Sequence, residues 1–360
     1  MALFDLPPKD SAGALFGRDA ELATMIRLIK EGRWSVILGP RMVGKTSLAK
    51  AATDRVGRPV VYVNLWGAKG TQGLLDAFLH GLNANRTLLS RIRGTLRRVN
   101  GLSIGPAGIA LEPRVRPLRS FWEMLDAVAA EGERTVIILD EVQELASISG
   151  SLLKSLANLF NTHPKVVFVF TGSYFGILRT LLEAPPDSPM YGRPPATVRL
   201  EPFSEDASVE FLRDGFREYG MEVPAEKLRS VVERSLDGIP GWLTLFGNNA
   251  AVGKMSMDAA ERFTVDEGKK VARSELSHFL EHRTPDLHWV ALRAMTTEVS
   301  WVEIRSAMST RRRSTVNENS VRNVLRALRD ANLISEKDHR YRISDPMVRA
   351  YVRATARPPK

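Results

Sequence analysis

The eight residues Gly39-Pro40-Arg41-Met42-Val43-Gly44-Lys45-Thr46 fit the pattern GxxxxGK[ST], in which a loop connects a strand to a helix. An apolar run at 36–38 precedes them, and a helical pattern follows them. In such a loop the backbone amides surround phosphate groups, Lys45 neutralises the β and γ oxygens, and the Thr46 hydroxyl ligates Mg²⁺. The stretch therefore predicts a nucleoside triphosphate site that extends through Ser47.

Further apolar runs, rich in β-branched residues, lie on both sides of this loop. They occupy 34–38, 60–64, 135–139, 166–171 and 197–200, and segments with helical periodicity separate them. This alternation predicts an α/β fold with a doubly wound parallel sheet over the first two hundred residues. An arginine-rich segment with an expected hairpin interrupts the pattern at about 70–118, and a proline-rich loop interrupts it at 184–195.

Two adjacent acids, Asp140 and Glu141, follow the apolar run 135–139. Alone, such a pair is also typical of a solvated strand end. After a phosphate-binding loop it indicates metal-dependent hydrolysis, in which Asp140 helps to hold Mg²⁺ and Glu141 orients and polarises the attacking water. We therefore expect Asp140, Glu141 and Lys45 to act in catalysis, with Thr46 and Asp140 at the metal.

Length and composition set limits on the class of protein. A chain of 360 residues is long enough for two or three domains. Its 44% apolar and 26% charged residues are typical of a globular protein, and the absence of cysteine excludes disulfide frameworks, thiolate metal sites and cysteine nucleophiles. No apolar run approaches about 18 residues and the first residues lack a signal-peptide pattern, so we expect a cytoplasmic protein without membrane contact.

The positive charge is unevenly distributed. The net charge is +10, and residues 301–360 contain 14 basic and 6 acidic residues. A second basic zone, 86–119, contains eight arginines and a single acid, Glu112. A basic C-terminal region is typical of a domain that faces nucleic acid.

After residue 200 the strand-like runs stop. Residues 203–283, here named the lid segment, read as helical throughout. Residues 284–360, the tail segment, show helical patterns at 286–295, 301–308 and 318–331, a basic loop at 309–314, and two short strands. Three helices followed by a two-stranded hairpin indicate a winged helix-turn-helix. We thus expect three domains, 1–202, 203–283 and 284–360.

This order of motifs resembles that of the archaeal-type ATPases of the AAA+ and STAND group of P-loop proteins, relatives of the origin-recognition initiators. The resemblance extends from Phe16-Gly17-Arg18-Asp19, which is similar to the family's motif beside the adenine, to the tail segment. It implies a five-stranded parallel core of order 5-1-4-3-2, a helical lid and a C-terminal winged helix. It also implies ATP and ADP as the bound nucleotides, with Gly17 and Arg18 near the base.

The resemblance also implies roles for single residues. The segment Thr171-Gly172-Ser173 ends the fourth core strand, where the family has its sensor 1. There Thr171 and Ser173 would contact the γ-phosphate or the water, although Thr171 could instead cap the next helix. The segment 238–240 resembles a GxP motif that places Pro240 against the base. A helix start with proline in its first turn fits the same residues, and both readings can hold together.

In the proline-rich loop, Tyr191-Gly192-Arg193 resembles a Tyr-Gly-Arg element of the family. From there Arg193 would reach a γ-phosphate either in its own chain or in a neighbouring subunit of a homo-oligomer. A solvated loop arginine is the alternative.

Two functions remain open for the whole chain. In the first, the ATPase is coupled to DNA binding through the winged helix; in the second, it is a signalling switch whose winged helix binds a protein. Basic residues before the expected recognition helix, on it and on the wing favour DNA. They are Arg311, Arg312, Arg313, Arg322, Arg326 and Arg340.

Overall fold

The computed structural model describes residues 2–99, 101–105, 108–112, 116–172, 177–281, 283 and 285–359. The chain divides into two compact units. The core unit comprises residues 8–38 and 45–200, and the C-terminal unit comprises residues 1–7, 39–44 and 201–360. The phosphate loop therefore belongs by its contacts to the C-terminal unit, although it connects two elements of the core unit.

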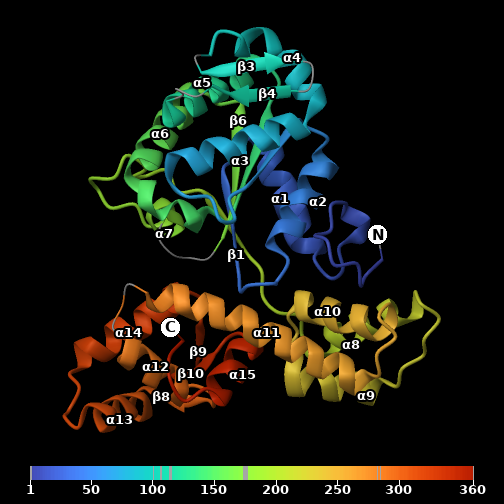
Figure 1. Cartoon of the computed structure of the whole chain (residues 1–360), viewed down its shortest axis with the longest axis vertical. Coiled ribbons are helices and arrows are strands. Elements are labelled where there is room, and N and C mark those ends of the chain that lie inside the picture. Colours follow the sequence, from blue (N-terminus) through green and yellow to red (C-terminus); the bar gives the residue numbers. More distant parts are fainter. Residues whose placement is uncertain are drawn as a thin grey trace. The chain divides into compact units, whose positions relative to one another are not determined.

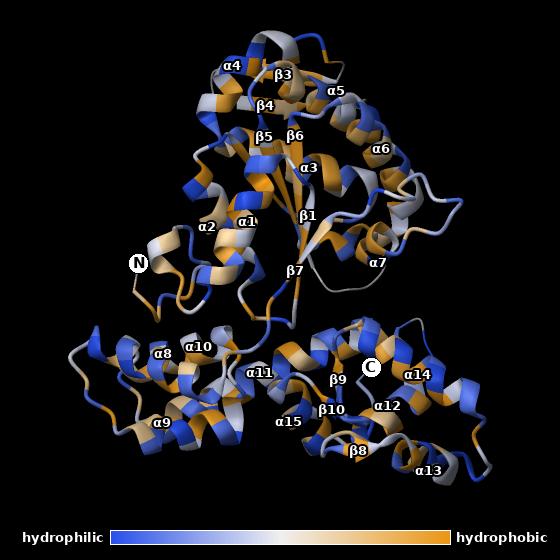
Figure 2. Ribbon diagram, turned by 180° about the vertical axis from the view of Figure 1, so that it is seen from behind, coloured by the Kyte–Doolittle hydropathy of each residue, from blue (hydrophilic) through white to orange (hydrophobic). Residues whose placement is uncertain are grey.

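A five-stranded parallel sheet forms the centre of the core unit (Figure 1). Its strands are β1 (Ser35–Leu38), β2 (Val60–Asn64), β5 (Thr135–Asp140), β6 (Val166–Thr171) and β7 (Ala196–Arg199), in the order β2-β5-β6-β1-β7. Counted among themselves, these strands have the order 5-1-4-3-2, so the predicted fold is confirmed. Every residue of β5 and β6 is buried, because helices cover both faces of a parallel sheet. Figure 2 shows both strands as hydrophobic over most of their length.

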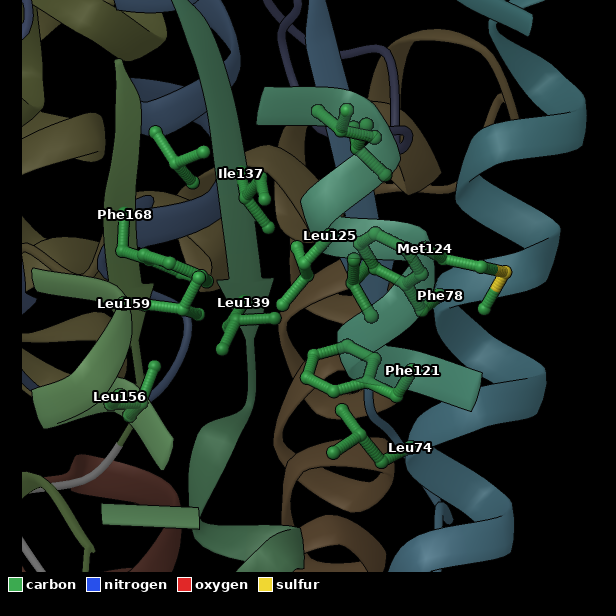
Figure 3. Close-up of a cluster of buried hydrophobic side chains, with 14 of the residues drawn as sticks. Leu74, Phe78, Phe121, Met124, Leu125, Ile137, Leu139, Leu156, Leu159 and Phe168 are labelled. Atoms are coloured by element: carbon green, nitrogen blue, oxygen red, sulfur yellow. The ribbon is translucent and has the colours of Figure 1, made fainter. Parts of the chain in front are cut away.

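Among the described residues of the core unit, six helices flank this sheet. They are α1 (Asp19–Glu31), α2 (Lys45–Val56), α3 (Gly70–Ala84), α5 (Pro117–Ala130), α6 (Ser149–Thr162) and α7 (Ile177–Leu182), with short 3₁₀ turns at Ala12–Ala14 (η1) and Val142–Ile148 (η2). Figure 3 shows apolar side chains of α3, α5 and β5 pointing toward one another. Phe78 and Phe121 meet edge to face, with ring centroids 4.9 Å apart. Burial of these rings fixes α3 and α5 on one face of the sheet.

The arginine-rich segment contains α4 (Arg86–Leu96) and a hairpin of β3 (Leu102–Gly105) and β4 (Gly108–Leu111). Pro106 and Ala107, where the sequence predicts the turn, lie outside the described residues. Asn83, near the end of α3, donates to the Ile109 carbonyl and accepts from the Ile109 amide, both at 2.9 Å. This pair of hydrogen bonds attaches the hairpin to α3.

The C-terminal unit is mostly helical. Its lid segment contains α8 (Glu205–Arg217), α9 (Ala225–Val231), a π-helical turn at Val232–Leu236 (η3), α10 (Pro240–Ala251) and α11 (Met257–Leu280). Its tail segment contains α12 (Pro285–Ala294), β8 (Val299–Ser300), α13 (Trp301–Arg312), α14 (Glu318–Asp330), β9 (Ile334–Lys337), β10 (Arg340–Ile343) and α15 (Pro346–Ala354). The three strands pair in the order β8-β10-β9. Within the described residues, no helix is both long and apolar enough to span a membrane.

The expected basic loop at 309–314 is wrong, because α13 continues to Arg312. Ser300 and Glu303 form a capping box that starts this helix, and Thr310 stays helical with its hydroxyl bonded to the Ser306 carbonyl at 3.0 Å. The helix ends where Arg313 adopts a left-handed conformation, φ +55°. Two elements of the tail segment, β8 and α15, were not anticipated from the sequence.

The start of the chain is anchored in the lid segment. Phe4 is fully buried and packs against Phe211 and Phe216, with ring centroids 5.9 and 5.1 Å away. The lid glycines Gly215 and Gly247 make room for its ring, since a Cβ atom at either position would overlap it. Asn248 also donates a hydrogen bond of 3.0 Å to the Phe4 carbonyl. The lid segment thus contains a socket that only glycine at these two positions leaves open.

We predict that Gly247→Ala lowers the free energy of unfolding by about 1–3 kcal/mol, because the added methyl group must displace the caged Phe4 ring. Urea unfolding followed by circular dichroism measures this change. Gly94→Ala is the matched control, since Gly94 lies in α4 with no atom within 4 Å of an added Cβ, and it should stabilise by about 0.5–1 kcal/mol. Equal stability of Gly247→Ala and the wild type would contradict the socket.

Candidate active site

The phosphate loop connects β1 to α2, and its backbone conformation explains its glycines. Gly39 and Gly44 have φ values of +153° and +101°, which side-chain-bearing residues rarely adopt. Met42 is left-handed at φ +62°. The helix α2 starts directly after the loop, at Lys45 and Thr46. The backbone amides of its first turn therefore lack helical partners and point out of its amino-terminal end, toward the loop. A helix N-terminus of this kind is suited to bind phosphate.

The buried carboxylate of Asp140, at the end of β5, lies at the centre of the described site. It accepts hydrogen bonds from the Thr46 hydroxyl at 2.9 and 3.1 Å and from the Tyr62 hydroxyl at 2.6 Å. The Thr171 hydroxyl, at the end of β6, donates a third. The fold thus brings together three residues that the sequence singled out, Thr46, Asp140 and Thr171, from α2, β5 and β6.

These residues fit a hard divalent cation. Mg²⁺ prefers oxygen ligands, keeps several waters, and is usually held by one or two protein groups together with substrate phosphates. Thr46 and Asp140 supply a hydroxyl and a carboxylate within 3.1 Å of each other. Among the described residues there is no cluster of three histidine, cysteine or acidic side chains that could hold a metal by itself. The hydroxyl of Thr46 and the carboxylate of Asp140 are oxygen donors of the kind that Mg²⁺ takes beside nucleotide phosphates.

Glu141 follows Asp140 in a left-handed conformation, φ +61°, which is uncommon outside glycine. Its amide donates to the Thr171 hydroxyl at 3.3 Å, and its carboxylate accepts from the Gln143 side-chain amide. The side-chain Oε1 atom of Gln143 leaves no room for a Cβ at Gly172, the residue after Thr171. The conformation of Glu141 is therefore fixed by the end of β6.

The Thr171 hydroxyl is engaged with the two acids, and the residue is fully buried. Sensing of the γ-phosphate or the water, and capping of the next helix, both stay predictions. Ser173, the other residue expected there, lies outside the described residues.

Arg193 does not join this group. Its guanidinium lies 5.8 Å from the Phe160 ring, and Phe160 packs on Trp34, with ring centroids 5.2 Å apart. Trp34 precedes β1 and bonds to Val166, the first residue of β6, so Arg193 is at the amino end of the sheet. Asp140 and Thr171 are at the carboxyl end. In this structure Arg193 therefore lies away from Asp140 and Thr171, and its contact with a γ-phosphate, in its own chain or in a neighbouring subunit, stays a prediction.

The residues expected near the base lie in two places. Gly17 is left-handed at φ +61°, and the largely buried Arg18 pairs with Glu21 at 3.2 Å. Pro240 is the first residue of α10, after Gly238 at φ +70°. The helix-start reading of this motif therefore applies, and contact with the base stays a prediction. Ser47 accepts a hydrogen bond of 3.1 Å from the Lys9 amide.

The arginines expected to contact DNA are all exposed. Arg311 and Arg312 form the last turn of α13, and Arg313 ends it. Arg322 and Arg326 are on α14, where Arg322 pairs with Glu318 at 3.1 Å. Arg340, on β10, donates to the Glu298 carbonyl at 2.8 Å.

Two residues of the site were missed by sequence reasoning. Tyr62 bonds to Asp140, and Gln143 bonds to Glu141. The available signal was the pattern of Val60-Val61-Tyr62-Val63-Asn64, in which the polar groups share one face of the strand. Burial, together with the neighbouring Asp140 carboxylate, raises the pKa of Tyr62, so its hydroxyl keeps the proton that it donates.

A family described as an ATPase domain predominantly from Archaea matches residues 15–246. The chain belongs to this family of archaeal-type ATPases. The match includes the loop, both acids and Thr171. A comparison with curated proteins gave no significant match.

Solved structures agree with this assignment. The Walker-type ATPase PABY2304 of Pyrococcus abyssi is 29% identical, with a TM-score of 0.77, and the alignment covers 98% of this chain and 99% of that chain. The ORC2 protein of Aeropyrum pernix, solved in ADPNP–ADP complexes, is 18% identical with a TM-score of 0.62 and coverage of 98% and 97%. The second likeness concerns the fold alone. The first agrees with the family in naming an ATPase, and both agree with the parallel sheet and helices described above.

For this archaeal-type ATPase we predict that Lys45→Ala weakens ATP binding by at least about 10-fold, because a charge-assisted contact to phosphate is lost. Glu141→Gln should keep its ATP affinity and hydrolyse it about 10²–10⁴ times more slowly, since the amide cannot polarise water. Titration with a fluorescent ATP analogue and phosphate release measure the two quantities. The exposed pair Lys30→Ala and Glu31→Gln on α1 serves as control. Equal turnover by Glu141→Gln and wild type would remove Glu141 from this role.

Proposed function

We propose that this ATPase hydrolyses ATP with Mg²⁺ and couples its nucleotide state to DNA binding through a winged helix in the tail segment. Lys45 and the amides of residues 39–47 would hold the phosphates, Thr46 and Asp140 the metal, and Glu141 the water. The observation that carries the coupling is that the phosphate loop is hydrogen-bonded to the lid segment, which in turn is packed against the tail segment.

The first step of this coupling is a backbone hydrogen bond. The amide of Gly241, in the first turn of α10, donates to the Met42 carbonyl of the loop at 2.9 Å. A Cβ at Gly241 would lie 2.7 Å from the Met42 Cβ and 2.9 Å from its carbonyl oxygen. Because the two backbones approach this closely, a change in loop conformation on nucleotide binding would move α10.

The second step joins the lid segment to α15 of the tail segment. Trp242 of α10 donates to the Asp345 carboxylate at 3.5 Å, and Asp237 pairs with Arg349 at 2.5 Å. Asp345 also caps α15 through the Met347 amide at 2.7 Å. Burial raises the pKa of Asp345, while its hydrogen bonds and the charge of Arg41 in the phosphate loop oppose that shift. These contacts favour movement of α15 together with α10.

The surface of the tail segment supports DNA as its ligand. Along α14 the exposed Arg322, Arg326 and Arg329 are spaced by about one turn. With Trp301 and Tyr341 they line a groove of about 450 Å³. A row of guanidinium groups beside an open groove suits a phosphate backbone.

We expect the triple variant Arg311→Ala/Arg312→Ala/Arg326→Ala to weaken DNA binding. The slope of log K against log salt concentration should become shallower by about 0.9 for each phosphate contact that is lost. Fluorescence anisotropy at several salt concentrations measures both. The control changes three exposed arginines elsewhere, Arg55, Arg262 and Arg273, to alanine. Point variants are preferable to removal of the tail segment, because α15 covers lid side chains. If the wild type binds no DNA at low salt, the tail segment instead serves a protein partner in a signalling switch.

ATP turnover in the presence of duplex, forked and single-stranded DNA completes this test. Stimulation by one form that weakens with salt is the expected result. Turnover indifferent to every DNA would contradict the proposed coupling.

Gly241→Ala should break the coupling while leaving the catalytic side chains in place, because its methyl group would separate α10 from the phosphate loop. The expected result is a DNA affinity that no longer differs between ADP and a non-hydrolysable ATP analogue. Gly150→Ala on α6, where an added Cβ meets nothing within 4 Å, is the control. A wild-type difference retained in Gly241→Ala would exclude this route.

A further inference from the structure

Tyr62 lies beside the proposed metal site on the strand next to the one that carries Asp140. In the parallel register of β2 and β5, Tyr62 is opposite Ile138 and Asn64 is opposite Asp140. Tyr62 and Asp140 therefore share one face of the sheet, two residues apart along the strands. A tyrosine side chain spans that diagonal, and its hydroxyl reaches the Asp140 Oδ2 atom at 2.6 Å.

The ring of Tyr62 is held in place by α2. The Lys50 ammonium lies 4.3 Å from the ring centroid. Lys50 is one helical turn after Thr46, so both residues face the sheet from the same side of α2. A cation over the ring face adds an electrostatic attraction to the packing. The phenol is thus enclosed between Thr46 with Lys50 on α2 and Asp140 on β5.

The hydroxyl has a role that a phenyl ring in the same place would lack. A partly buried phenol costs free energy unless its proton has a partner, and here the partner is a carboxylate. The Thr46 hydroxyl donates its hydrogen bond to the same carboxylate, so a lone pair of the Thr46 oxygen is left to bind a cation. This arrangement requires the Asp140 carboxylate to keep one orientation. Tyr62 and Thr171 fix that orientation from two strands, one on each oxygen.

We propose that Tyr62 is a positioning residue for the metal: its hydroxyl orients Asp140 so that Asp140 and Thr46 together receive Mg²⁺. This inference rests on the proposed Mg²⁺ dependence and adds a residue to it. Partners of this kind, which orient a metal-binding group without touching the metal, typically change metal affinity or activity by about 10–100-fold when removed.

The test uses the full chain with Tyr62→Phe, which removes a single oxygen and keeps the ring under Lys50. Binding of a fluorescent ATP analogue is measured at increasing Mg²⁺ concentrations, which gives the Mg²⁺ concentration at half-effect. The affinity for the same analogue is also measured in EDTA, without free Mg²⁺. We expect the Mg²⁺ concentration at half-effect to rise about 10-fold or more, with unchanged nucleotide affinity in EDTA. Tyr219→Phe makes the same change at an exposed tyrosine of the lid segment and should match the wild type.

A role in the fold alone predicts a different result. If Tyr62 acts on the metal, saturating Mg²⁺ restores the turnover of Tyr62→Phe to near the wild-type value. Turnover that stays low at saturating Mg²⁺, or an unchanged half-effect concentration in a Mg²⁺-dependent wild type, would overturn the inference. A wild type whose nucleotide binding ignores Mg²⁺ would instead refute the metal dependence under Proposed function.

Discussion

The core unit depends on the hydrogen bonds that the carboxylate of Asp140 accepts. It is 4% exposed, and a buried charge is tolerated only when hydrogen bonds replace the water it has lost. Three hydroxyl groups do so here, from α2, β2 and β6. Because these donors come from elements far apart in the sequence, Asp140 fixes the relative positions of the start of α2, the middle of β2 and the end of β6 at one point.

The strand order makes this convergence possible. In the order β2-β5-β6-β1-β7, Asp140 ends the strand between Tyr62 and Thr171, and the phosphate loop leaves the strand on the other side of β6. Parallel strands end at the same edge of the sheet, so every group carried beyond a strand end meets its neighbours there. Even the strained conformation of Glu141 follows, because its amide is tied to the end of β6.

The sequence predicts those parts that depend on local patterns. Apolar runs bounded by helical periodicity fix the five strands, and the loop motif together with the paired acids fixes where the chemistry lies. The sequence did not predict that Tyr62 and Gln143 belong to the site. The partner of a polar side chain depends on strand register, which apolar runs do not reveal. The place of Arg193 also escaped, since a proline-rich loop has no periodicity that fixes its path. The basic segment after residue 308 was predicted as a loop because serine and threonine have a weak helix preference, yet α13, which starts at the capping box of Ser300, continues to Arg312.

The division of the chain into units bears on how the proposed coupling could work. Residues 39–44 are continuous with β1 and α2, yet their contacts group them with the C-terminal unit. The first seven residues are grouped in the same way, through the buried Phe4. The phosphate loop therefore belongs to the sheet by covalent connection and to the lid segment by packing. A nucleotide that changes the conformation of this loop must either break the Met42–Gly241 hydrogen bond or carry α10 with it. Trp242 of α10 is also hydrogen-bonded to Asp345 at the start of α15. If α10 moves with the loop, the movement would therefore extend directly to α15 of the tail segment.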